Sequence, residues 1–155
     1  MTESEIESRA ERAMELFRQG FNCAQSVVAA CADIFGIDEQ TALCTAASFG
    51  GGIGRMRQTC GAACGMFILE GWRSGSAIAG DHAGKSRNYA RVQDLANRFK
   101  AENGSLVCAE LLGMAQVKAD RSPEPEARTE QYYRKRPCVE MVGNAVRNFL
   151  SYDNQ

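Results

Sequence analysis

Apolar positions recur every three or four residues along most of this chain, which is the spacing of one face of an α-helix. The segments with this repeat are 2–18, 23–35, 39–48, 60–69, 82–103, 105–112 and 138–150. Asn22, Asp38 and Asp81 stand where N-caps are expected. No segment alternates apolar and polar residues as a half-buried strand does. The pattern predicts an all-α fold, a compact bundle of about six helices in a single domain over residues 1–155.

Three stretches interrupt or modify this pattern. Residues 71–80 are expected to form a loop, and residues 114–136 a long charged surface connection. The segment 60–69 contains mostly small and apolar residues, and Thr59 is its expected N-cap. Glycine inside a helix costs about 1 kcal/mol relative to alanine. The glycines of this segment therefore predict a buried helix that another backbone approaches closely.

The composition limits the functional classes to which this chain can belong. The chain has 155 residues, of which 45% are hydrophobic and 24% charged, and its formal net charge is -1. A chain of this length can build a core without covalent staples. The absence of a basic excess argues against nucleic-acid binding, and no apolar run is long enough for a membrane span. The N-terminal residues are charged and lack the apolar region of a signal peptide, so we expect a cytoplasmic protein.

Seven cysteines dominate the candidate chemistry. An odd number without a secretory signal disfavours a structural disulfide framework. Cys23, Cys60 and Cys138 each fall in the first turn of a predicted helix, and Cys108 lies in the short helix after Gly104. Unpaired N–H groups and the helix macrodipole favour a thiolate at such positions. Taken alone, the spacing of these four matches no short zinc or ferredoxin motif.

The other cysteines have simpler interpretations. Cys31 and Cys44 lie within apolar helical stripes and are expected to be packing residues. Cys64 follows Cys60 by one turn, and we leave open whether it is a second thiol near the site or part of the core. The single histidine, His82, opens a polar helix, where a solvated side chain is the simpler expectation.

The residues 59–65, TCGAACG, fit a C-G-A-x-x-G motif, and the preceding GFNCA at 20–24 and single cysteines at 108 and 138 complete a pattern. With these features the chain resembles the C_GCAxxG_C_C family of redox-active proteins over about residues 9–149. The resemblance implies a helical domain with four key cysteines, which map onto Cys23, Cys60, Cys108 and Cys138. It also implies redox activity with an iron–sulfur prosthetic group. Cys31, Cys44 and Cys64 are additional to that pattern.

Three functions follow from these residues. The first is an iron–sulfur electron-transfer protein, with a cluster held by the four cysteines and positive charge from Arg55 and Arg57. The second is a metal-free thiol–disulfide protein, although the usual C-x-x-C spacing is missing. The third is a structural zinc module, which a chain with an adequate core does not need. We expect a redox partner protein and neither nucleic acid nor membrane. A homodimer is compatible with the sequence, which leaves open whether the protein is an enzyme.

Overall fold

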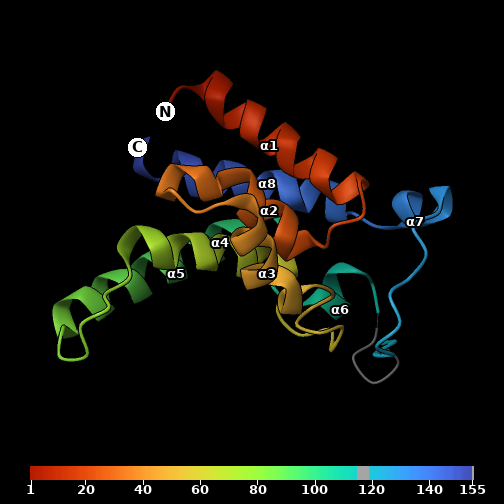
Figure 1. Cartoon of the computed structure of the whole chain (residues 1–155). Helices are drawn as coiled ribbons and strands as arrows, with labels where there is room; N and C mark the ends of the chain where they lie inside the picture. The colour runs from red at the N-terminus through yellow and green to blue at the C-terminus, as the bar shows by residue number, and fades with distance from the viewer. Residues whose placement is uncertain (115–118, 155) are drawn as a thin grey trace.

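The computed structural model describes residues 1–114 and 119–154, and within them the chain is helical without strands, as predicted (Figure 1). The helices are α1 (Glu3–Arg18), α2 (Cys23–Cys31), α3 (Glu39–Ala46), α4 (Gly61–Ser74), α5 (His82–Asn103), α6 (Cys108–Leu111), α7 (Glu130–Lys135) and α8 (Cys138–Ser151). Short 3-10 turns extend the chain at η1 (Ala32–Phe35), η2 (Ala47–Phe49) and η4 (Tyr152–Asn154).

The core lies among α1, α2, α4 and α8. Helix α8 packs against α1, α2 and α4, while α5 covers α4 and α8, and α3 covers α2. The two termini lie close together in Figure 1, where the Asn154 side chain donates to the Met1 carbonyl at 2.9 Å. The largest fully buried side chains include Phe17, Phe99 and Phe149. The cysteine-bearing helices α2, α4 and α8 are thus packed directly on one another.

Local caps explain where the first helices begin. Thr2 forms a reciprocal capping box with Glu5 at the start of α1, and Asn22 forms one with Gln25 at the start of α2. The Nδ2 of Asn22 also donates to the Ala47 carbonyl at 3.0 Å. Asp81 caps α5 through the Gly84 N–H. The Asn22 cap has a functional consequence, because it makes Cys23 the first residue of α2.

Several boundaries differ from the sequence expectation. Helix α4 continues to Ser74, into the expected loop 71–80, because Arg73 donates to the Phe149 carbonyl and stacks on its ring at 3.6 Å. Cys60, rather than Thr59, is the N-cap of α4. The expected connection 114–136 contains α7, which Thr129 caps; residues 115–118 of that connection lie outside the described residues.

The two cysteines expected to be packing residues have different surroundings. Cys31 is fully buried, as predicted. Cys44 is exposed, so the prediction for it was wrong. Helix α3 packs on α2 through Ala42 and Ala46, which are one helical turn apart, and Cys44 lies halfway between them on the opposite side.

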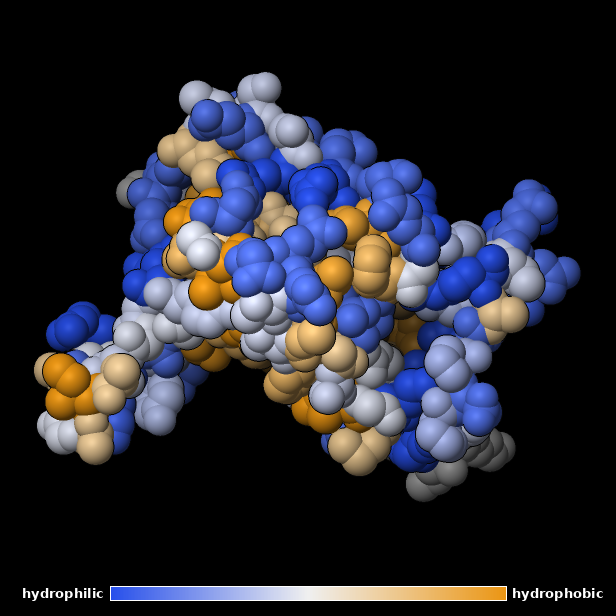
Figure 2. All heavy atoms as spheres, in the orientation of Figure 1, coloured by the Kyte–Doolittle hydropathy of each residue, from blue (hydrophilic) through white to orange (hydrophobic). Residues whose placement is uncertain are grey.

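The side drawn in Figure 2 mixes hydrophilic residues with patches of apolar atoms, one of which lies at the tip between α4 and α5. Ile78, which is 70% exposed, belongs to this connection. Within the described part of the chain, no helix combines the length and apolar character that a membrane crossing needs.

Candidate functional site

Four helix starts carry the four cysteines singled out by sequence. Cys23, Cys108 and Cys138 are the first residues of α2, α6 and α8, and Cys60 is the N-cap of α4. The first N–H groups of a helix have no partner within the helix. The sulfurs therefore lie where backbone donors and, in the longer helices, the macrodipole stabilise negative charge.

A short antiparallel contact joins two of these helix starts. The Cys60 N–H donates to the Leu106 carbonyl at 2.7 Å, and the Cys108 N–H donates to the Gln58 carbonyl at 2.6 Å. An isolated bridge between Thr59 and Val107 lies between these bonds. The start of α4 is thereby tied to the start of α6, which sets Cys60 beside Cys108.

Two glycines bring α4 against α2. A Cβ added at Gly61 would lie 2.8 Å from the Phe49 carbonyl oxygen and 3.3 Å from the Cys23 sulfur. One added at Gly65 would lie 2.9 Å from the Val27 Cβ. The expectation that these glycines permit a close backbone approach is therefore confirmed, and the approach places Cys23 next to the first residue of α4.

The loop between η2 and α4 has an unusual backbone. Ile53, Arg55 and Arg57 adopt left-handed conformations with φ of 66°, 61° and 61°, a region that costs free energy for residues other than glycine. Hydrogen bonds from the Arg57 and Gln58 N–H groups to the carbonyls of residues 51 and 52 close the loop. The loop directs Arg57 toward the site, where its Nη1 donates to the Cys108 sulfur at 3.8 Å.

The side chains of Cys23 and Cys138 share a hydrogen bond. The bond lowers the pKa of Cys23 to about 6, and N–H groups of Gly51 and of Cys23 itself act in the same direction against burial. The same bond, followed by burial and the nearby Cys23 charge, raises the pKa of Cys138. The opposite directions of these two pKa shifts favour the thiolate at Cys23 and the thiol, as hydrogen-bond donor, at Cys138.

Cys60 and Cys108 remain thiols beside this pair. Burial is the main cause that raises the pKa of each, and the charge of Cys23 raises both further. Arg57 opposes the shift at Cys108. Each of the four sulfurs acts electrostatically on others of the set, so the structure brings all four predicted cysteines into one neighbourhood.

A cavity of about 420 Å³ opens onto this neighbourhood. Cys23, Cys108 and Cys138 line it, whereas Cys60 is buried and does not. Four arginines also line the cavity: Arg55, Arg57, Arg128 and Arg136. A small molecule can thus reach a thiolate through a cationic opening.

A family model described as "Putative redox-active protein (C_GCAxxG_C_C)" matches residues 21–152. The chain belongs to the C_GCAxxG_C_C family. The matched range begins two residues before Cys23 and runs past the end of α8, so it contains all four of the cysteines at the helix starts. Comparison with curated proteins and with solved structures found no match.

The sequence predicts that four cysteines of this C_GCAxxG_C_C protein bind a metal, and this prediction can be compared with how the side chains are arranged. Among the residues that the structure describes, no three Cys, His, Asp or Glu side chains are grouped to hold one metal ion. Four cysteine sulfurs are nonetheless the donor set of [2Fe–2S] and [4Fe–4S] clusters. The chemistry of the donors fits a cluster, and the role of the four cysteines as ligands stays a prediction.

Other sequence candidates lie outside the central pair. Cys64 is buried, its thiol lies 3.9 Å from the Thr59 carbonyl, and burial together with the Cys23 charge raises its pKa to about 11. Burial raises the pKa of Cys31 to about 12. His82 is exposed at the start of α5, away from the residues that line the cavity.

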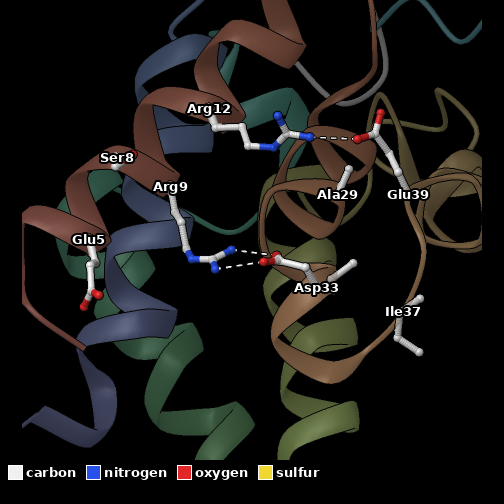
Figure 3. Close-up of a pocket in the computed structure, with 9 residues that line it drawn as sticks. Glu5, Ser8, Arg9, Arg12, Ala29, Asp33, Ile37 and Glu39 are labelled. Carbon is white, nitrogen blue, oxygen red and sulfur yellow. Dashed lines mark hydrogen bonds and ion pairs between the residues drawn. The ribbon is translucent and has the colours of Figure 1, made fainter.

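A second hollow in the C_GCAxxG_C_C protein, of about 560 Å³, lies between α1 and the η1 turn (Figure 3). Arg9 forms a bidentate pair with Asp33 there, and Arg12 pairs with Glu39 at 2.7 Å. Opposite charges are matched in this hollow, and it contains no cysteine. It therefore offers no comparable chemistry.

Sequence reasoning missed the contribution of the segment before α8. Arg128, Tyr132 and Arg136 line the cavity, although the segment was expected to be a surface connection. The signal that could have found them is the interleaving of arginines and tyrosines between residues 128 and 136, immediately before Cys138. Guanidinium groups stack favourably on such rings.

Proposed function

We propose that this protein is a thiol–disulfide redox protein in which Cys23 is the attacking sulfur and Cys138 the resolving sulfur. The observation that carries the proposal is that the side chains of Cys23 and Cys138 share a hydrogen bond and that both residues line one cavity. In a C-x-x-C motif the attacking and resolving cysteines both lie at the start of one helix. Here the same two roles fall to cysteines at the starts of two helices, α2 and α8.

The reaction follows from the protonation of the pair. The Cys23 thiolate attacks one sulfur of a substrate disulfide, forming a mixed disulfide and releasing a thiolate that takes a proton from water. The Cys138 sulfur then attacks the Cys23 sulfur and breaks the mixed disulfide. The second substrate half leaves with the proton that Cys138 gave up. Two electrons have passed from the two cysteines to the substrate disulfide, and the reverse sequence oxidises a dithiol.

The division of roles is supported by the electrostatics of the pair. A pKa of about 6 keeps Cys23 largely ionised at neutral pH, and the thiolate is the nucleophile in exchange reactions. Cys138, whose pKa is raised, cannot compete for the first attack. Its proximity favours the second attack, because the reacting sulfurs need not find each other by diffusion.

Oxidation with 2-hydroxyethyl disulfide tests the proposal. The reduced protein should form a Cys23–Cys138 disulfide, identified by peptide mapping with mass spectrometry. Cys138→Ser should accumulate a mixed disulfide on Cys23, and Cys23→Ser should lose the fast reaction. Cys44→Ser, which changes an exposed cysteine outside the cavity, is the matched control. A fast reaction that persists in Cys23→Ser would overturn the assignment.

A second candidate is electron transfer by an iron–sulfur cluster on Cys23, Cys60, Cys108 and Cys138. It is favoured by the meeting of four cysteines from four helix starts beside several arginines. Such a cluster would supply one-electron chemistry, and the N–H groups of Gly51 and Cys23 are donors placed near sulfur. A redox partner protein would then exchange electrons at this face. Zinc on the same sulfurs is the structural alternative.

Metal analysis separates this candidate from the first. Iron, acid-labile sulfide and zinc would be measured after anaerobic purification and after reconstitution. Stoichiometric iron and sulfide that are lost in Cys→Ser variants at each of the four positions, but not in Cys44→Ser, would establish the cluster. Absence of all three after reconstitution would leave thiol–disulfide exchange as the function of the site.

A further inference from the structure

The wall of the cysteine cavity carries an excess of positive charge. Its four arginines come from two segments, the loop 50–58 and residues 128–136, which both line the cavity. Among the described lining residues the only carboxylate is Glu126, and it pairs with Arg136. The wall is therefore cationic even with the Cys23 thiolate counted.

Arg128 contributes much of this excess. Its guanidinium donates to the carbonyls of Phe17 at 2.7 Å and Phe21 at 2.9 Å, and it stacks on the rings of Phe17 and Tyr132 at 4.2 and 5.0 Å. These partners are all uncharged. Within the described chain no carboxylate lies in ion-pair range of Arg128, and its charge acts on the Cys23 sulfur. The hydrogen bonds and the ring stacking hold this charge in a fixed place beside the nucleophile.

Two of the other arginines have an acidic partner that partly balances their positive charge. Arg136 pairs with Glu126 while it lies over the Tyr132 ring at 5.0 Å, and its side chain is 12% exposed. Arg55 has Asp120 at 3.5 Å and also donates to backbone carbonyls of the segment that covers the cavity. These contacts fix the wall in position, so the positive potential is present before any ligand arrives.

We infer that the site takes small disulfides and thiols that carry carboxylate groups. The inference rests on the proposed thiol–disulfide function and assigns its substrate class. A cavity of about 420 Å³ falls in the size range of small-molecule sites. A carboxylate held at the cationic wall brings an attached disulfide toward Cys23, while a cationic disulfide is repelled. The exchange itself follows the same two steps, attack by Cys23 on the substrate disulfide and then attack by Cys138 on the mixed disulfide.

Three disulfides of similar length and different charge provide the test. They are 3,3′-dithiodipropionate, with two carboxylates, neutral 2-hydroxyethyl disulfide, and cystamine, with two ammonium groups. The second-order rate of mixed-disulfide formation at Cys23 would be measured in Cys138→Ser, which stops the reaction at that step. Each rate would be divided by the rate of the same disulfide with a small thiol, which removes intrinsic differences in reactivity.

The normalised rate should be about tenfold higher for the anionic than for the neutral disulfide, and lowest for cystamine. High salt should reduce the differences among the three normalised rates, because salt screens the charges. Arg128→Gln should lower the anionic-to-neutral ratio severalfold, and Arg128→Lys should retain more of it. Arg134→Gln is the matched control, because Arg134 is exposed on α7, pairs with Glu130 and does not line the cavity.

The outcomes separate the two proposals. If none of the disulfides reacts at Cys23, the thiol–disulfide function fails. If all three react at equal normalised rates, or cystamine reacts fastest, that function stands and the carboxylate preference is wrong. Should Arg128→Gln fail to fold, the charge series and its salt dependence in the Cys138→Ser protein still decide the question.

Discussion

The thiol of Cys138 donates a hydrogen bond to the sulfur of Cys23, although the two residues lie near opposite ends of the chain. Both open a helix, and α2 and α8 pack directly on each other. Two cysteines with similar local surroundings thereby acquire different protonation states. The hydrogen bond stabilises the charge on Cys23 and holds the proton on Cys138.

The first prediction concerns the pH dependence of Cys23 alkylation. The rate of iodoacetamide modification at Cys23 should rise with a midpoint near pH 6, because only the thiolate reacts. Cys138→Ala removes the donor and should move the midpoint upward. Cys138→Ser keeps an O–H donor and should move it less. Peptide mapping gives the site-specific rate, and a midpoint near that of a free thiol in the wild-type protein would contradict the hydrogen bond.

The second prediction concerns stability as a function of pH. The folded-state pKa of Cys23 lies below its ordinary value, so ionisation stabilises the folded state once pH exceeds the folded pKa of about 6. The contribution is complete above the unfolded pKa of about 8.5 and is lost as pH falls through 6. The difference in unfolding free energy between wild type and Cys23→Ser should therefore grow from pH 5.5 to 8.5. A constant difference over this range would exclude the shift.

The third prediction concerns the glycines at the α2–α4 contact. Gly61→Ala and Gly65→Ala should each destabilise the protein by about 1–3 kcal/mol, because the new methyl groups meet backbone oxygens of Phe49 and Ala24. Gly71→Ala, in the same helix with open space around it, should stabilise by about 0.5–1 kcal/mol. Urea unfolding measures all three. Equal effects at the three positions would show that helix propensity, not close packing, governs these sites.

The fourth prediction separates two cysteines outside the site. Cys31→Ala should cost about 1–2 kcal/mol, because Cys31 is fully buried and its removal leaves a small cavity. Cys44→Ala should change stability by less than about 0.5 kcal/mol, because its side chain is exposed. Both variants should retain the oxidation behaviour of Cys23 and Cys138. Altered oxidation in Cys31→Ala at normal stability would assign Cys31 to the site.

The fifth prediction concerns a buried charge outside the cysteine cavity. The Glu70 side chain is fully buried, and Arg91 donates to its Oε1 while Arg73 lies 3.7 Å from its Oε2. Arg91→Met should destabilise by about 3 kcal/mol, because it leaves a buried carboxylate without its closest partner. Arg87→Met, at an exposed position in the same helix, is the control. Adding Glu70→Met to Arg91→Met should restore part of the loss, as thermal unfolding would measure.

The starts of α2, α3 and α5 could be predicted from the sequence because capping is a local interaction. The Asn22 side chain reaches the Gln25 N–H three residues away, and Asp81 reaches Gly84 in the same way. These short-range contacts determined that Cys23 would open a helix, and Pro137 likewise precedes α8. The family pattern, which combines the motif at 59–65 with GFNCA at 20–24 and single cysteines at 108 and 138, then selected four of the seven cysteines, and in the structure these four lie near enough to act on one another electrostatically.

Only the tertiary structure decided which cysteines share a hydrogen bond and which helix faces are buried. The partner of Cys23 follows from the packing of α2 on α8, and the exposure of Cys44 follows from the side of α3 that meets α2. The cationic wall depends on Arg128, whose position is set by carbonyls at the end of α1. Such contacts join residues far apart in sequence. Their free energy depends on how whole helices pack, which neither local propensity nor residue spacing encodes.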